Sequence, residues 1–124
     1  MSEKKGANIK YIHEPLTPIH RSGNTKEADI VAAILRFLRT VPGCFAWKTH
    51  GGMYGTAGIP DIIACIDGSF FAFEVKTVTG KATPLQETTI RKILAAGGTA
   101  AVVRSVDEVR ALLSPDCTVL CNEQ

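Results

Sequence analysis

Two carboxylates within one short stretch are the residues best placed to do chemistry. Residues 58–76 read GIPDIIACIDGSFFAFEVK, with Asp61 near the start and Glu74 near the end. The Asp-Gly pair at 67–68 lies between two apolar runs rich in β-branched and aromatic residues, a pattern typical of a two-residue type I′ β-hairpin. That turn sets Asp61 directly opposite Glu74, where like charges destabilise a sheet. The chain therefore needs something that compensates this repulsion.

A lysine beside the acids indicates what could compensate them. Lys76 follows Glu74 by two residues, so it belongs to the same face of the strand. Mg²⁺ prefers oxygen ligands, usually one or two carboxylates together with waters and phosphate oxygens. Such an ion can lower the pKa of a water and stabilise charge on a phosphoryl group, and a nearby ammonium can assist. The pattern favours metal-assisted chemistry on a phosphate ester; the alternative is that both acids lie in solvent at a fraying hairpin end.

The alternation of side chains divides the predicted hairpin into two faces that are both mostly apolar. One face carries Asp61, Ile63, Cys65, Phe70, Ala72, Glu74 and Lys76, and the other carries Ile62, Ala64, Ile66, Phe71, Phe73 and Val75. A strand pair that is apolar on both sides is typical of a central position with helices on each face. We therefore expect the acids and the lysine to cluster at one end of a dry surface.

A predicted first helix contributes a third acid. It begins at residue 24 or 25 and ends before Pro42, and Glu27 lies on the same stripe as the apolar residues Ile30, Val31, Ile34 and Leu38. An acid on that stripe could serve the metal site. It could equally complement the helix dipole in the first turn, and the residues alone leave both interpretations open.

A predicted second helix brings a glutamine toward the same region. Thr83 suits the N-cap position, Pro84 the first helical position, and the glycines at 97–98 the C-terminal end. Gln86 stands three residues after Thr83, where a capping box places a glutamine, and it also shares a stripe with the apolar residues of this helix. The two roles are compatible.

The remaining elements predict an α/β fold. Strands are expected over 44–48 and 99–103, a short helix from Ser105 to Leu113, and a last strand over 118–120. The order helix, three strands, helix, strand, helix predicts a mixed central sheet flanked by helices. Cys44, Cys65 and Trp47 are expected to be core residues.

The first 23 residues differ from the rest of the chain. They mix lysines with prolines and show no sustained period, so we expect a flexible or partner-draped N-terminal arm over 1–23. Residues 24–124 are expected to form a single domain, which the length of 124 residues accommodates.

Composition excludes several classes of protein. The hydrophobic fraction of 45% and the charged fraction of 21% are ordinary for a soluble globular chain. There is no apolar run long enough for a membrane span or a signal peptide, so we expect a cytoplasmic protein. The four cysteines form no CxxC pair, which argues against a zinc site or a disulfide framework. A net charge of +2 does not by itself indicate a nucleic-acid partner.

The glycine-rich loop over 50–58 carries a weaker signal. It lacks the GK[ST] of a phosphate-binding loop, so it is either a mobile loop that admits substrate or a plain connection. His50 beside it could contact a phosphate, although a lone histidine is more often a bystander. Lys48, at the end of the strand before it, could contact DNA or simply be solvated.

These residues resemble a known family. GIPD at 58–61 with EVK at 74–76 resembles the PD-(D/E)XK motif of the restriction-endonuclease-like nucleases. With TKEADIVAAIL at 25–35 and PLQ at 84–86, the chain resembles more narrowly the VRR-NUC subfamily. The likeness covers residues 25–113, and the αβββαβ core of that family is the order predicted above. The fusion partners of larger members are absent, as in stand-alone phage and bacterial nucleases, which implies a bacterial or phage-infected host cell.

The resemblance implies a role for each site residue. Asp61 and Glu74 would be metal ligands, together with the backbone carbonyl of Val75. Lys76 would be the catalytic lysine. Glu27 would hold the metal directly or through water, and Gln86, counted with the catalytic residues, would position Lys76 or the nucleophile.

The resemblance also implies an activity. We expect a Mg²⁺- or Mn²⁺-dependent DNA endonuclease that leaves a 5′-phosphate and a 3′-hydroxyl, selects DNA structure, and cleaves branched, Holliday-junction-like DNA as a homodimer. Cationic side chains would contact the phosphates without reading sequence: Lys48, Lys76, Lys81, Arg91, Lys92 and Arg104. The alternatives are a non-catalytic nucleic-acid-binding module that retains the fold, or a metal-dependent phosphatase.

Overall fold

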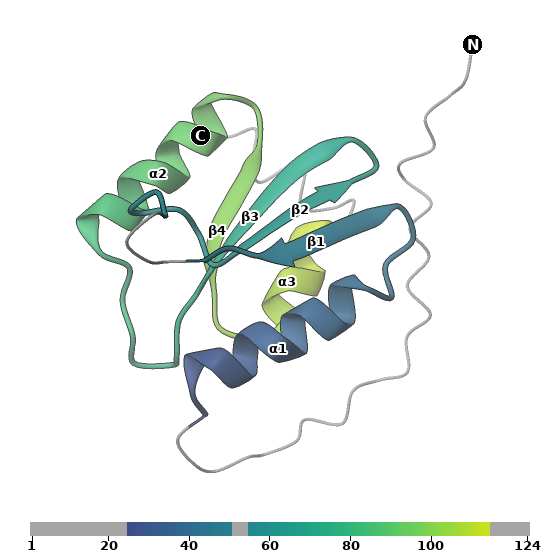
Figure 1. Cartoon of the computed structure of the whole chain (residues 1–124), viewed down its shortest axis with the longest axis horizontal. Helices are drawn as coiled ribbons and strands as arrows, with labels where there is room; N and C mark the ends of the chain where they lie inside the picture. The colour runs from purple at the N-terminus through teal and green to yellow at the C-terminus, as the bar shows by residue number, and fades with distance from the viewer. Residues whose placement is uncertain (1–24, 51–54, 115–124) are drawn as a thin grey trace.

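The chain folds around one mixed sheet (Figure 1). A computed structural model describes residues 25–50 and 55–114. Its elements are α1 (Glu27–Leu38), β1 (Cys44–Lys48), β2 (Ile62–Ile66), β3 (Ser69–Val75), α2 (Pro84–Ala95), β4 (Thr99–Val103) and α3 (Val106–Leu113). The strands lie in the order β1-β2-β3-β4, antiparallel except for the parallel pair β3 and β4. The predicted α/β architecture is confirmed, whereas the N-terminal arm and the strand at 118–120 fall outside the described residues.

The hairpin between β2 and β3 has the predicted register. Ile66 pairs with Ser69, and Ile63 pairs with Ala72. Asp67 and Gly68 have φ angles of 49° and 83°, so both central residues are in the left-handed region that a type I′ turn requires. The turn therefore fixes which side chains meet across the two strands.

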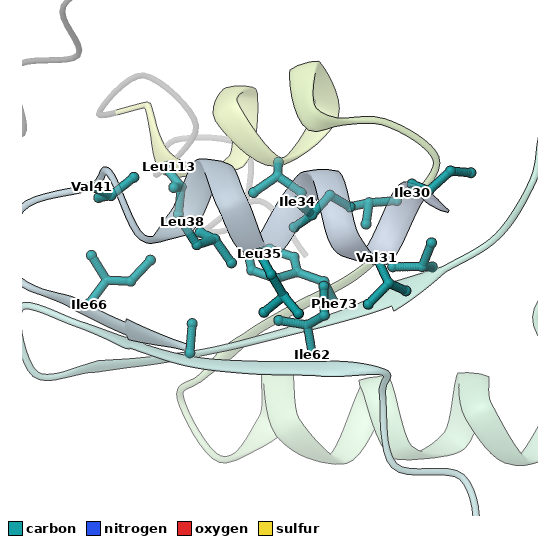
Figure 2. Close-up of a cluster of buried hydrophobic side chains, with 14 residues drawn as sticks. Ile30, Val31, Ile34, Leu35, Leu38, Val41, Ile62, Ile66, Phe73 and Leu113 are labelled. Carbon is teal, nitrogen blue, oxygen red and sulfur yellow. The ribbon is translucent and has the colours of Figure 1, made fainter. Parts of the chain in front are cut away.

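Helices cover both faces of the sheet, as the two apolar faces of the hairpin predict. On one face α1 and α3 enclose the main core, in which Leu38, Ile62 and Phe73 are fully buried (Figure 2). On the other face α2 packs Ile90 and Ile93 against a smaller cluster, formed by Ile63, Ala72 and Ala100. The first helix begins at Glu27, two or three residues later than predicted, and its N-cap residue Lys26 makes no side-chain capping bond.

The second face is covered only in part. α2 packs against β4, at the opposite edge of the sheet from β1, so no helix of the described residues covers the part of this face nearest β1. Trp47 is 44% exposed and Cys65 is also exposed, so the prediction that both are core residues is wrong. Sequence alternation identified two apolar faces, but it could not show how far one helix of twelve residues extends across four strands.

Candidate active site

Asp61 and Glu74 stand at the open end of the hairpin. Asp61 directly precedes β2, Glu74 is the penultimate residue of β3, and the register sets them opposite each other. The Asp61 carboxylate accepts a hydrogen bond from the Val75 backbone N–H at 2.9 Å. Glu74 is 2% exposed and is the one charged residue that is buried among the residues described. A buried acid opposite a second acid is costly unless a cation or proton neutralises it.

Thr49, which sequence reasoning missed, fixes the position of Asp61. Its hydroxyl donates to the Pro60 carbonyl at 2.7 Å, and its backbone N–H donates to the Asp61 carbonyl at 2.9 Å. Both bonds come from Thr49, and they hold the main-chain carbonyls of Pro60 and Asp61 in place. The signal that could have found Thr49 is the pairing of β1 with β2, because the residue opposite Asp61 follows from that register.

Gly58 allows the loop that leads to Pro60 and Asp61 to lie against α2. Its φ is +82°, and a Cβ built there would stand 2.7 Å from the Leu85 Cγ atom and 3.0 Å from the Thr89 hydroxyl. Both the backbone angle and the close approach exclude a larger residue without a shift of the loop. Steric contact with α2 thus explains why the first residue of the GIPD motif is a glycine.

Glu74 has an incomplete set of hydrogen bonds. Its Oε1 accepts from the Gln86 side-chain amide at 2.8 Å and lies 3.6 Å from the Lys76 ammonium. Its Oε2 is buried and has no hydrogen-bond partner in the described structure. Burial, followed by the negative charge of Asp61, raises the pKa of Glu74 to about 7, although Lys76 acts in the opposite direction. At neutral pH this carboxyl is therefore poised to exchange a proton for a cation.

Glu27 reaches the site through Lys76. The Lys76 ammonium lies 3.8 Å from the Glu27 carboxylate, so it stands between the acid of α1 and the acid of β3. The Glu27 side chain is half exposed, although the residue belongs to the predicted apolar stripe. Within residues 25–50 and 55–114 no three histidine, cysteine or acidic side chains come close enough to form a metal site by themselves. The structure thus groups Asp61 with Glu74, and joins Glu27 to them through the lysine.

The donor set fits a hard divalent cation. Asp61 and Glu74 offer carboxylate oxygens only, which Mg²⁺ and Mn²⁺ accept and which suit softer metals less well. The unpartnered Glu74 Oε2 is a buried acceptor that a cation would satisfy. The carbonyl of Val75, named by the resemblance, belongs to the residue whose N–H holds Asp61, and its role as a ligand stays a prediction.

Gln86 combines two roles. Its side-chain oxygen accepts from the Thr83 N–H at 2.9 Å, and its own N–H donates to the Thr83 hydroxyl at 3.2 Å, which completes the predicted capping box of α2. The amide nitrogen of the same side chain donates to Glu74. The cap therefore orients Gln86 toward the buried acid, and its side chain contacts Glu74 rather than Lys76.

The predicted cationic residues are distributed over several elements. Lys48 ends β1, Lys81 precedes α2, and Arg91 and Lys92 lie on α2; all four are exposed. Arg104 differs, because its guanidinium donates to the Gly80 carbonyl at 2.8 Å and so supports the loop between β3 and α2. Among the described residues, no helix has the length and apolar character needed to cross a membrane.

Comparison with known proteins identifies the fold. The α/β core, a four-stranded mixed sheet with helices on both faces, has a restriction-endonuclease-like fold. Two solved structures, described as "VRR_NUC domain" and "VRR_NUC domain protein", each match with a TM-score of 0.59 over 72% of this chain. The identities are 23% and 20%, and the matches cover 95% and 85% of those chains. No family model and no curated protein matches. The chain therefore has the VRR-NUC fold.

Proposed function

We propose that this chain is a metal-dependent nuclease that hydrolyses phosphodiester bonds in DNA. The observation that carries the proposal is the buried Glu74, with one unpartnered carboxylate oxygen, beside Asp61 and Lys76. A module that only binds nucleic acid gains nothing from two opposed acids, one of them buried, because they weaken its sheet. The VRR-NUC fold supports the same activity.

The site residues divide the work among them. Mg²⁺ or Mn²⁺ held by Asp61 and Glu74, with the Val75 carbonyl, would neutralise charge on the phosphate and act as a Lewis acid. The Lys76 ammonium donates to a phosphate oxygen and stabilises the negative charge that develops during attack. Gln86 fixes Glu74 through its Oε1, which leaves the Oε2 free to act as a ligand.

Two further residues set the position and charge of this site. Thr49 holds the main chain of Asp61 in register with Glu74. Glu27 pairs with Lys76, which holds the ammonium close to the acids, and it would contribute to the metal site directly or through water.

The proposed substrate is branched DNA. Exposed Lys48, Lys81, Arg91 and Lys92 would bind phosphates without reading sequence, which leaves DNA structure as the basis of selection. One domain carries one site and cuts one strand, so symmetric cleavage of a four-way junction needs two copies related by a two-fold axis. We therefore propose a homodimeric, structure-selective endonuclease that acts in the cytoplasm.

A panel of labelled linear, flapped and four-way DNAs, incubated with Mg²⁺, Mn²⁺ or EDTA, tests this function. We expect cleavage that requires the metal, prefers the branched substrates and is lost in Glu74→Gln. Binding without cleavage by the wild type would identify a binding module, and hydrolysis of a generic phosphomonoester alone would identify a phosphatase. Either result would overturn the proposal.

A further inference from the structure

Within the part of the chain that the structure describes, the strand β1 leaves an apolar surface uncovered. Phe45 is 71% exposed and Trp47 is 44% exposed, and their ring centroids lie 5.4 Å apart. Phe45 pairs with Cys65, which in turn pairs with the 45% exposed Phe70, so the aromatic surface continues across three strands. No charged side chain interrupts this row. An uncharged apolar surface of this kind marks an interaction site.

The backbone of β1 is also open on its outer side. In the sheet β1 is an edge strand, with β2 as its neighbour in the described structure (Figure 1). The Thr49 N–H donates to the Asp61 carbonyl and the Asp67 N–H donates to the Gly43 carbonyl, so odd-numbered residues of β1 hydrogen-bond to β2. Backbone groups alternate in an antiparallel ladder, so those of Ala46 and Lys48 point to the open edge.

From these two features we infer that β1 is the dimer interface, and that it pairs antiparallel with β1 of a second copy about a two-fold axis at Ala46. Pairing residue 46 with itself brings every outward-facing backbone group of the strand opposite another such group: 46 opposite 46, and 44 opposite 48. The Cys44 N–H already donates to the Val41 carbonyl at 3.3 Å, so Ala46 and Lys48 supply the main donors. Other registers would use less of the strand.

This register is self-complementary in its side chains. Phe45 of one copy falls opposite Trp47 of the second copy, and the reverse pair forms on the other side of the axis. Aromatic pairs across neighbouring strands stabilise a sheet. Lys48, the one charged residue of β1, falls opposite Cys44 rather than opposite its own copy, so the two-fold arrangement brings no like charges together.

A second copy fits this surface better than nucleic acid does. A base could stack on Phe45 or Trp47, but it would not satisfy the row of backbone donors and acceptors on the open edge of β1. The exposed parts of the three rings amount to about 300 Å² per copy, if each aromatic side chain offers roughly 200 Å². That area suits the apolar centre of an interface of about 800 Å² per partner.

The inferred dimer places both proposed active sites on one surface. An axis perpendicular to the sheet keeps the two copies facing the same way, and Phe45 and Trp47 share their face with Asp61 and Glu74 through the register. Strand spacings put the two acid pairs on the order of 25 Å apart. This part of the inference rests on the proposed function, since only a nuclease needs both sites to meet one DNA.

Assembly can be tested without DNA or metal. We expect sedimentation equilibrium of the wild-type chain in EDTA to give a dimer at concentrations on the order of 100 μM. Trp47 is the only tryptophan, so its emission should shift to shorter wavelength as concentration rises and the dimer forms. Phe45→Lys should give a monomer with an unchanged circular dichroism spectrum. Leu94→Lys, a matched change at a 40% exposed residue of α2, should remain a dimer.

Amide hydrogen exchange tests the register. The Ala46 and Lys48 amides should be protected in the wild type and exchange at least tenfold faster in Phe45→Lys. The Phe45 and Trp47 amides, which bond to β2, should be protected in both proteins. The inference fails if the wild type is a monomer. It fails equally if that monomer binds DNA through Trp47, seen as quenching of its fluorescence, or if another segment of the same chain protects the Ala46 amide.

The inference also fails if Phe45→Lys remains a dimer. Because none of these measurements involves cleavage, an inactive dimer would remove the proposed function and leave the interface standing. A monomer that cleaves DNA would remove the interface, and with it the proposed homodimer, but would leave the metal-dependent nuclease activity standing. The two proposals can therefore fail separately.

Discussion

The two ends of the β2–β3 hairpin are built in opposite ways. At the turn end, Asp67 and Gly68 satisfy the turn by their own backbone preferences, with both φ angles positive. At the open end, Asp61 and Glu74 are held by residues distant in sequence, Thr49 directly after β1 and Gln86 on α2. One end is stable by local geometry, whereas the other carries a buried acid with an unpartnered oxygen.

This difference separates stability from function within one element. A turn that is locally satisfied should affect only folding when it is changed. An end that keeps two acids together against their repulsion should gain stability when one acid is neutralised, and should lose activity at the same time. The following changes test whether the two ends behave as differently as their contacts indicate.

Asp61→Asn should have the largest effect. At about 5 Å and an effective dielectric near 20, two like charges repel by roughly 3 kcal/mol as an upper guide, much reduced by water and by Lys76. The amide oxygen can still accept from the Val75 N–H. We expect the variant to melt in EDTA at the same temperature as the wild type or higher, to lose most of the stabilisation by Mn²⁺, and to cleave DNA slower by orders of magnitude.

DNA binding provides the control for this variant. Lysines and arginines carry most of the affinity, so binding to labelled DNA should survive the Asp61→Asn change. If Mn²⁺ raises the melting temperature of the variant as much as that of the wild type, and the variant still cuts DNA, the metal is not bound at this end of the hairpin.

Glu74→Gln should change how stability depends on pH. The pKa of Glu74 is about 7 in the folded state against an ordinary value of 4.5, so between these values the folded state binds more protons than the unfolded state. Its contribution to the free energy of unfolding therefore falls as pH rises through this window, by at most about 3 kcal/mol. In EDTA, the free energy of unfolding of the variant should rise relative to that of the wild type between pH 5 and pH 8, as measured by urea denaturation. Equal slopes for the two proteins would contradict the raised pKa.

Thr49→Val removes one hydroxyl from the support of Asp61. It leaves the Pro60 carbonyl without its 2.7 Å donor, which should cost about 1 to 3 kcal/mol in the free energy of unfolding. Because the Asp61 main chain loosens, the Mn²⁺ affinity should fall several-fold by calorimetric titration. Thr49→Ser keeps the hydroxyl and should restore the affinity. If Val and Ser lower stability and affinity equally, the hydroxyl does not position Asp61.

The sequence predicted the turn end almost completely, because its determinants are local. The Asp-Gly pair and the alternation of apolar residues were sufficient for the register, and that register alone placed Asp61 opposite Glu74. The capping box of Thr83 and Gln86 is local as well, and it was predicted for the same reason.

The supports of the open end could not be predicted in this way. Thr49 acts through the pairing of β1 with β2, and the Gln86 bond to Glu74 depends on where α2 crosses the sheet. The exposure of Trp47 has the same origin, since it depends on how much of one sheet face α2 covers. Single positions carry no signal for such long-range geometry.

Glu27→Gln separates the two interpretations of that acid. The Glu27 side chain is half exposed and 3.8 Å from the Lys76 ammonium, so loss of its charge should cost less than about 1 kcal/mol in stability. If Glu27 serves the site, cleavage should fall at least tenfold while the melting temperature hardly changes. Normal turnover at low Mg²⁺ would show that Glu27 acts only on the helix dipole.

Gly68→Ala should have the smallest effect on activity. Gly68 has a φ of 83°, and a Cβ built there meets no atom within 4 Å, so the cost is backbone strain alone, about 1 kcal/mol in the free energy of unfolding. Asp67→Asn, which tolerates the left-handed conformation, is the matched control and should keep wild-type stability. Both variants should retain the Mn²⁺ response and the cleavage rate of the folded protein. A change of cleavage rate in Gly68→Ala, measured well below its melting temperature, would mean that strain at the turn reaches the acids, and that the two ends of the hairpin are coupled rather than independent.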